Sequence, residues 1–119
     1  MYYLISALYL STCDTCKRII SELELKEKGF EFQDIKTEKI TPTQLEEMKN
    51  NAGSYEALFS RIARKYKELD LGSKKLTETD YKNFILDEYT FLKRPVIFIG
   101  KKMFVGNTKS VVAEAKIAL

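Results

Sequence analysis

Residues 2–16 read YYLISALYLSTCDTC, and this stretch decides the fold. Its first part, residues 2–10, is apolar except at Ser6, which is typical of a strand buried on both faces of a sheet. A Ser-Thr pair then predicts a turn. Apolar residues at helical spacing continue until Gly29, which favours the left-handed conformation that ends many helices. The segment therefore predicts a strand, a turn and a helix, with the CDTC motif where the helix begins.

The rest of the chain completes a mixed α/β pattern. Residues 30–35 alternate apolar and polar side chains and predict a second strand, parallel to the first because a helical crossover joins them. Residues 96–105 predict an antiparallel hairpin, and residues 111–118 a final amphipathic helix. The order βαβ, helical insert, ββα predicts an α/β, thioredoxin-like fold with a mixed four-stranded sheet. We expect a single domain, residues 1–119, with the insert at about 41–92.

The insert contains three predicted helix starts. Thr41 is expected to be an N-cap, with Pro42 at the first helical position and Gln44 completing a capping box. Ser54 and Thr77 are expected to begin two further helices. The apolar face of the helix after Ser54 would contain Tyr55, Leu58, Phe59 and Ile62.

Composition and charge exclude several classes of protein. Of the 119 residues, 45% are hydrophobic and 31% are charged, as expected of a globular domain. The formal net charge of +3 is spread over the chain, which argues against binding nucleic acid directly. No apolar stretch is long enough to span a membrane, so we expect a cytoplasmic protein that does not contact the membrane. The absence of histidine excludes Ser-His-Asp and Cys-His catalysis and every metal site that needs histidine.

The two cysteines, Cys13 and Cys16, allow three interpretations. They could be a redox pair, half of a zinc site, or two small core residues. Zinc usually takes four ligands, and this chain has neither a second CxxC motif nor a histidine, so we expect no metal. A turn between a strand and a helix is a poor place to bury two unreactive side chains. A redox pair is the favoured interpretation.

A redox role has a physical basis in the predicted position of the pair. The N-terminal amides of a helix stabilise a thiolate at Cys13, and the thiolate is the nucleophilic form. Cys16 lies one turn further on the same face, within reach of a mixed disulfide at Cys13. We therefore assign Cys13 as the nucleophile and Cys16 as the resolving thiol. Lys17 and Arg18 would either add positive potential or form a solvated basic patch.

The step Arg94-Pro95 precedes the third predicted strand. Proline is tolerated at the first residue of a strand, and X-Pro bonds are almost the only peptide bonds found in the cis form. Pro95 is therefore a candidate cis proline, the alternative being an ordinary trans proline that starts the strand. Arg94 would then point toward Cys13, and its planar guanidinium suits an oxyanion. Arg61 and Arg64 are two further candidates for the same pocket, unless they form surface salt bridges.

Together these motifs resemble the ArsC/Spx family, which groups arsenate reductases, related thiol oxidoreductases and Spx-type regulators. The similarity runs nearly end to end and rests on CDTCKR at 13–18, YKEL at 66–69, LKRPV at 92–96 and FVG at 104–106. The resemblance implies a thioredoxin fold with Cys13 as the nucleophile. It also implies that Arg94 binds the oxyanion, with Arg61 or Arg64 as a second arginine.

The residues after Cys13 depart from one branch of this family. Glutathione-coupled arsenate reductases typically have a single cysteine followed by Ser and Arg, whereas this chain has Cys16 and Lys17 further along the motif. The departure favours an intramolecular disulfide. We predict a thiol-disulfide oxidoreductase or arsenate reductase-like enzyme that acts on a small oxyanion or a disulfide. It would bind no cofactor and would use an external reductant, thioredoxin or a low-molecular-weight thiol. The alternative is an Spx-like redox sensor that binds the C-terminal domain of the RNA polymerase α subunit.

Overall fold

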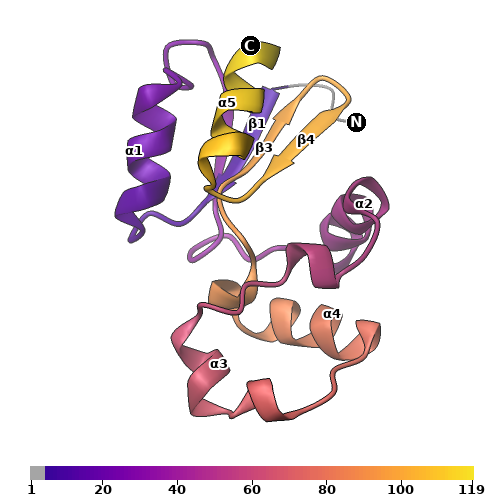
Figure 1. Cartoon of the computed structure of the whole chain (residues 1–119). Helices are drawn as coiled ribbons and strands as arrows, with labels where there is room; N and C mark the ends of the chain where they lie inside the picture. The colour runs from indigo at the N-terminus through magenta and orange to yellow at the C-terminus, as the bar shows by residue number, and fades with distance from the viewer. Residues whose placement is uncertain (1–4) are drawn as a thin grey trace. The chain divides into compact units, whose positions relative to one another are not determined.

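The chain forms two compact units (Figure 1). The computed structural model describes residues 5–119. The sheet unit contains residues 5–39 and 94–119, and the helical unit contains residues 40–93. The helical unit nearly coincides in extent with the insert predicted from the sequence.

The sheet unit is built on a mixed four-stranded sheet with the order β2-β1-β3-β4. Its strands are β1 (Ile5–Tyr9), β2 (Glu31–Asp34), β3 (Val96–Ile99) and β4 (Lys102–Val105). β1 is parallel to β2 and antiparallel to β3, and β3 is antiparallel to β4. The α/β class and the mixed sheet predicted from the sequence are therefore confirmed. Residues 2–4 of the predicted first strand lie outside the described part of the chain.

Helices α1 (Asp14–Glu22) and α5 (Lys109–Ala118) pack on the sheet and close its core (Figure 1). Both helices and the strands contribute buried side chains to this core: Ala7, Ile19, Ile20, Leu23, Leu25, Phe30, Ile97 and Ala115. Ala7 and Leu8 are consecutive in β1 and are both buried. Because consecutive strand residues point to opposite faces, β1 is buried on both faces as its apolar sequence predicts.

The first helix ends seven residues before Gly29, which is earlier than the sequence predicts. After Glu22 the chain turns through Glu24, whose φ of 55° lies in the left-handed region. The Leu25 N–H donates to the Ile20 carbonyl at 3.0 Å, which satisfies a carbonyl of the last turn. Leu25 is completely buried in the core. We infer that this burial offsets the cost of a left-handed glutamate, roughly 1–2 kcal/mol.

The helical unit contains three α-helices and three short 3₁₀ segments. They are α2 (Pro42–Ala52), η1 (Glu56–Leu58), α3 (Arg64–Glu68), η2 (Leu71–Ser73), α4 (Glu78–Asp87) and η3 (Tyr89–Phe91). Thr41 and Gln44 form the predicted capping box of α2. Thr77 and Asp80 form another at α4. Both caps can be predicted from the sequence because a cap depends only on residues within one turn.

The helix predicted after Ser54 is wrong beyond its first turn. The Ser54 hydroxyl does accept the Ala57 N–H at 3.1 Å, but only the 3₁₀ segment η1 follows. At Phe59 the backbone becomes extended and forms an isolated antiparallel bridge with Leu92. Ile62, expected on the buried face, is 88% exposed. Tertiary packing of Phe59 has overridden the local helical pattern.

Phe59 is the centre of an aromatic core in the helical unit. Its fully buried ring stacks on Phe91, with centroids 5.0 Å apart, and lies at a tilt 4.9 Å from the ring of Tyr81. The rings of Tyr66 and Phe84 complete the cluster at 6.1 and 6.4 Å. Aromatic pairs at such distances stabilise a core beyond the area that they bury.

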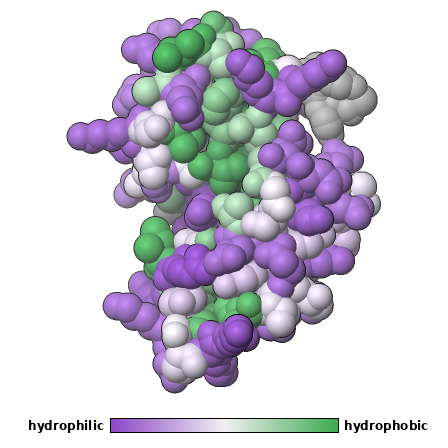
Figure 2. Space-filling view, turned by 45° about the vertical axis from the view of Figure 1, so that its right-hand side comes forward, coloured by the Kyte–Doolittle hydropathy of each residue, from purple (hydrophilic) through white to green (hydrophobic). Residues whose placement is uncertain are grey.

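Exposed large hydrophobic side chains are scattered in the described part of the chain. They are Ile62, Leu69, Ile117 and Leu119. On the face seen in Figure 2, hydrophobic residues lie in patches between hydrophilic ones. Within residues 5–119, no helix has the length and apolar character that crossing a membrane would require.

Candidate active site

Cys13 is the N-cap residue of α1, at the end of the loop that leaves β1. Its backbone is extended, with φ −101° and ψ 109°, and its carbonyl accepts the Lys17 N–H at 3.2 Å. The Cys13 N–H donates to the Leu10 carbonyl at 2.9 Å, which closes the turn between strand and helix. This position places the Cys13 side chain at the positive end of the helix, where a thiolate is stabilised.

Cys16 lies in the first turn of the same helix and is completely buried, whereas Cys13 is partly exposed. Both are free thiols in the structure. Ile19 and Ile20, further along α1, anchor the helix in the core. Of the two sulfurs, Cys13 is therefore the one that an incoming molecule meets first.

The surroundings of Cys13 lower its pKa below the ordinary value of a thiol. Partial burial alone would raise the pKa, but the backbone N–H and the thiol of Cys16, which face the Cys13 sulfur in the first turn of α1, outweigh it. The positive charge of Arg94 and a hydrogen bond from its side chain lower the pKa further. A larger share of Cys13 is thus in the reactive thiolate form near neutral pH than for an ordinary cysteine.

The surroundings of Cys16 act in the opposite direction. Burial, and to a smaller extent the neighbouring Cys13, raise the pKa of Cys16 to about 12. Cys16 is therefore a protonated thiol near neutral pH and a hydrogen-bond donor to Cys13. When two interacting groups have pKa values pushed apart in this way, they can take different chemical roles.

Arg94 and Pro95 belong to the same unit as the two cysteines, immediately before β3. The Arg94–Pro95 peptide bond is cis, in agreement with the sequence-based expectation. The Pro95 carbonyl accepts the Gly106 N–H at 3.0 Å, so the end of the β3–β4 hairpin fixes this step. The structure thus brings together Cys13, Cys16 and Arg94.

Lys17 and Arg18 form exposed ion pairs on the surface of α1. The Lys17 Nζ lies 3.8 Å from an Asp14 carboxylate oxygen, and the Arg18 Nη1 lies 3.4 Å from one of Glu22. These geometries favour the solvated basic patch over a direct electrostatic role at Cys13. Exposed pairs of this kind contribute little to stability.

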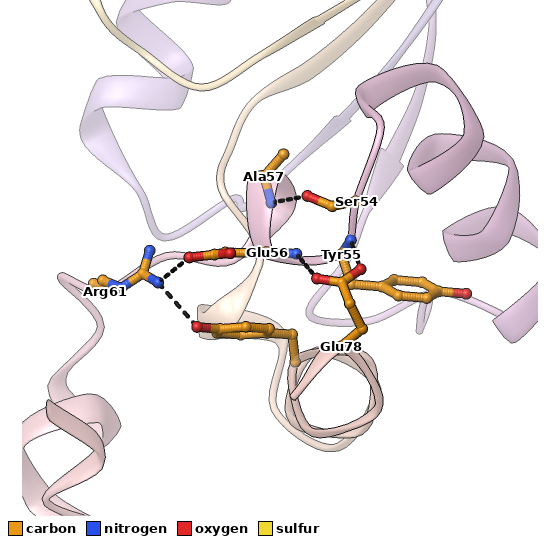
Figure 3. A network of polar contacts seen from close by, with 7 residues as sticks. Ser54, Tyr55, Glu56, Ala57, Arg61 and Glu78 are labelled. Atoms are coloured by element: carbon orange, nitrogen blue, oxygen red, sulfur yellow. Dashed lines mark hydrogen bonds and ion pairs between the residues drawn. The ribbon is translucent and has the colours of Figure 1, made fainter. Parts of the chain in front are cut away.

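Arg61 belongs to the helical unit, where it is part of a polar network (Figure 3). One guanidinium nitrogen, Nη2, donates to a Glu56 carboxylate oxygen at 2.8 Å and to the Tyr81 hydroxyl at 3.0 Å. The guanidinium also lies over the rings of Tyr81 and Phe59, at 5.7 and 6.0 Å from their centroids. The hydrogen bond with Glu56 raises the pKa of Arg61 above its ordinary value. Arg61 thus connects η1 with α4 inside the helical unit.

Glu78 extends this network to α4. Its two carboxylate oxygens accept the backbone N–H groups of Tyr55 at 2.7 Å and Glu56 at 3.1 Å (Figure 3). The first residue of α4 therefore satisfies backbone donors at the start of η1 and holds Glu56 beside Arg61.

We expect Arg61→Ala to lower the free energy of unfolding by about 1 kcal/mol, because Arg61 is half-exposed but combines an ion pair, a hydrogen bond and ring contacts. Arg64→Ala is the matched control. Arg64 is exposed at the start of α3, and we expect its replacement to change stability by less than about 0.5 kcal/mol. Chemical denaturation of both variants measures the difference. Equal stabilities would show that the network does not hold the unit together.

Arg61 and Arg64 both lie in the helical unit, and Cys13 lies in the sheet unit. Their role as further anion ligands stays a prediction. Among residues 5–119 there is also no group of three or more Cys, Asp or Glu side chains arranged to hold a metal ion.

Sequence reasoning missed Asp34, the last residue of β2. Its Oδ1 accepts the backbone N–H of Ser11, in the loop that carries Cys13, at 3.2 Å. The available signal was topological: an aspartate at the carboxyl end of β2 must lie beside the carboxyl end of the parallel strand β1.

A parallel and antiparallel sheet in the order β2-β1-β3-β4, a cysteine pair at the start of α1 and a cis proline before β3 define a thioredoxin-like protein. The sequence pattern of the ArsC family matches residues 8–115, and the chain belongs to this family.

Solved structures agree with this assignment at the level of the fold. A protein from Bacteroides fragilis, related to the ArsC family, has a TM-score of 0.80 and 20% identity, covering 99% of this chain and 100% of that one. An arsenate reductase from Vibrio cholerae has a TM-score of 0.77 and 16% identity, with coverage of 92% and 95%. An arsenate reductase related protein from Brucella melitensis has a TM-score of 0.72 and 24% identity, with coverage of 97% and 95%. Comparison with the curated proteins gives no match.

Proposed function

We propose that this protein is a thiol-dependent reductase of the arsenate reductase-like kind, which acts on a small oxyanion or a disulfide. The observation that carries the proposal is the contrast between its two thiols. Cys13 is partly exposed and its pKa is lowered, whereas Cys16 is buried and its pKa is raised to about 12. Such a contrast suits a nucleophile followed by a resolving thiol.

With a disulfide substrate, the Cys13 thiolate attacks one sulfur, so that a mixed disulfide forms and one thiolate leaves. The Cys16 sulfur then attacks the Cys13 sulfur. The Cys13–Cys16 bond forms, the mixed disulfide breaks, and the second departing thiolate takes up the proton that Cys16 loses. One substrate disulfide is reduced and one protein disulfide is made.

With arsenate, the Cys13 thiolate forms a sulfur–arsenic bond and one arsenate oxygen leaves as water after protonation. Attack of Cys16 on the Cys13 sulfur forms the protein disulfide and breaks the sulfur–arsenic bond. The electron pair of that bond stays on arsenic, which is reduced by two electrons to the level of arsenite. Arg94, whose charge already acts on Cys13, would hold the oxyanion.

The cycle needs an external thiol donor. A thioredoxin-type protein or a low-molecular-weight dithiol would return two electrons and two protons to the Cys13–Cys16 disulfide. We place this chemistry in the cytoplasm, where such reductants are maintained.

We expect Cys16→Ser to stop the cycle after its first chemical step. The variant keeps the Cys13 nucleophile and a hydroxyl donor at position 16, but no thiol to resolve the intermediate. With a model disulfide it should release one equivalent of thiol and retain a mixed disulfide at Cys13, detectable by intact mass. Turnover of arsenate or the disulfide by the wild-type protein, coupled to a thioredoxin system, is the reference measurement. Absence of turnover on both substrates would contradict the proposed enzyme.

An Spx-like switch would use the same two thiols to change a surface that binds the polymerase α C-terminal domain. A pull-down with that domain under reducing and oxidising conditions separates the two functions. Binding in one redox state, without turnover, would favour the switch.

A further inference from the structure

The Asp34 carboxylate ties the loop before Cys13 to the neighbouring strand. In the parallel register Asp34 lies beside Tyr9, and the Ile35 N–H donates to the Tyr9 carbonyl at 2.9 Å. Beyond this last ladder bond, the Asp34 Oδ1 accepts two backbone N–H groups, from Ser11 and Lys36, each at 3.2 Å. The Ser11 side chain is a further partner and is the largest influence that lowers the pKa of Asp34. Beyond the end of β1, the Asp34 carboxylate therefore takes the place of the backbone hydrogen bonds that pair β1 with β2.

Ser11 is two residues before Cys13, and the loop between them is short. At its far end, the Cys13 N–H donates to the Leu10 carbonyl at 2.9 Å. Cys16, in contrast, is positioned by the helix itself, whose buried residues belong to the core of the sheet unit. The position of the Cys13 side chain at the N-terminus of α1 therefore depends on where the loop places Cys13.

We propose that Asp34 is a positioning residue for the nucleophile: by holding Ser11, its carboxylate keeps the Cys13 side chain at the positive, N-terminal end of α1. This role rests on the proposed function, in which Cys13 reacts as a thiolate. Asp34 acts through the loop and does not touch the reacting atoms.

The negative charge of Asp34 and the hydrogen bonds that Asp34 accepts affect the pKa of Cys13 in opposite directions. A negative charge near a thiolate disfavours the thiolate, whereas correct placement of the sulfur at the positive end of α1 favours it. The other charged groups in play are Lys36, beside Asp34, and Arg94, beside Cys13. Because the two effects differ in sign, suitable variants can separate them.

The test uses Asp34→Ala, Asp34→Asn and the control Glu31→Ala, which changes an exposed acid on the same strand. The alanine variant removes both charge and acceptor. The asparagine variant removes the charge but keeps an oxygen that can accept the Ser11 and Lys36 N–H groups. The readout is the rate of iodoacetamide alkylation at Cys13 as a function of pH, located by peptide mass spectrometry. Thermal unfolding establishes that each variant is folded at the assay temperature.

We expect Asp34→Ala to move the midpoint of the alkylation curve of Cys13 to higher pH and to slow the reaction at pH 7 by about two- to tenfold, the range for a weakened interaction of a thiolate with a helix N-terminus. Asp34→Asn should restore the midpoint to the wild-type value or below it, and Glu31→Ala should leave it unchanged. If Asp34→Ala does not fold, Asp34→Ser takes its place. Its shorter side chain withdraws the acceptor from Ser11, so we expect the same shift of the midpoint to higher pH.

Two results would overturn the positioning role. One is an unchanged midpoint in Asp34→Ala, and the other is the same downward shift in the alanine and asparagine variants, which would indicate charge alone. The shift relative to the wild type tests Asp34, whereas the wild-type midpoint itself tests the proposed function, so the two failures are distinguishable.

Discussion

Cys13→Ser is expected to lower turnover by at least about a thousandfold, because a serine hydroxyl has no thiolate form near neutral pH and cannot form the mixed disulfide. The variant should also lose alkylation at pH 7, since the remaining cysteine is buried and its pKa is raised to about 12. The coupled reductase assay and peptide mass spectrometry measure the two effects.

The matched control for Cys13→Ser is Cys16→Ser, which should keep the alkylation of position 13 while losing turnover. The reverse assignment of roles would appear as a reactive Cys16 in the Cys13→Ser protein. Thermal unfolding of both variants excludes loss of structure as the cause. Alkylation of Cys13→Ser at the wild-type rate would show that the nucleophile has been misassigned.

Arg94→Gln is expected to decrease turnover by about ten- to a hundredfold, the range for losing a hydrogen bond to a charged group. Two causes act together. Removing the positive charge beside Cys13 raises the pKa of the thiol, and it also removes the donor proposed to hold the oxyanion. Because a raised pKa shifts the alkylation curve to higher pH, the loss of reactivity should be largest at low pH and shrink as the pH rises.

Two variants separate these causes. Arg94→Lys keeps the charge but not the planar fork, so it should recover the alkylation curve more fully than it recovers turnover of an oxyanion. Arg18→Gln removes a guanidinium from an exposed ion pair on α1 and should change neither measurement. An unshifted curve in Arg94→Gln would contradict the electrostatic role of Arg94.

The parts of the fold that depend on neighbouring residues were predictable from the sequence. The capping boxes that begin at Thr41 and Thr77 and the hairpin formed by β3 and β4 follow from residues within a few positions of one another. The end of α1 and the fate of the segment after Ser54 were not predictable in this way. They depend on the burial of Leu25 and Phe59 among residues distant in the sequence.

In the candidate site, too, the features marked by local sequence were predictable and those that depend on distant residues were not. Cys13, Cys16 and Arg94 were predicted because a motif and a strand boundary mark them. The opposed pKa values of the two thiols could not be read from the CxxC spacing, because they depend on burial and on the Arg94 charge. The bond between Asp34 and Ser11 joins residues 23 positions apart and becomes visible only once the strands are paired.

The central claim is that Cys13 is an activated thiolate and Cys16 its protonated partner. The most direct test is a site-resolved alkylation titration of the fully reduced wild-type protein. We predict that the pKa of Cys13 lies below the ordinary value of a cysteine thiol and that Cys16 stays unmodified in the folded protein over the same range of pH. A Cys13 that titrates at or above the ordinary value, or a Cys16 that reacts first, would contradict the account.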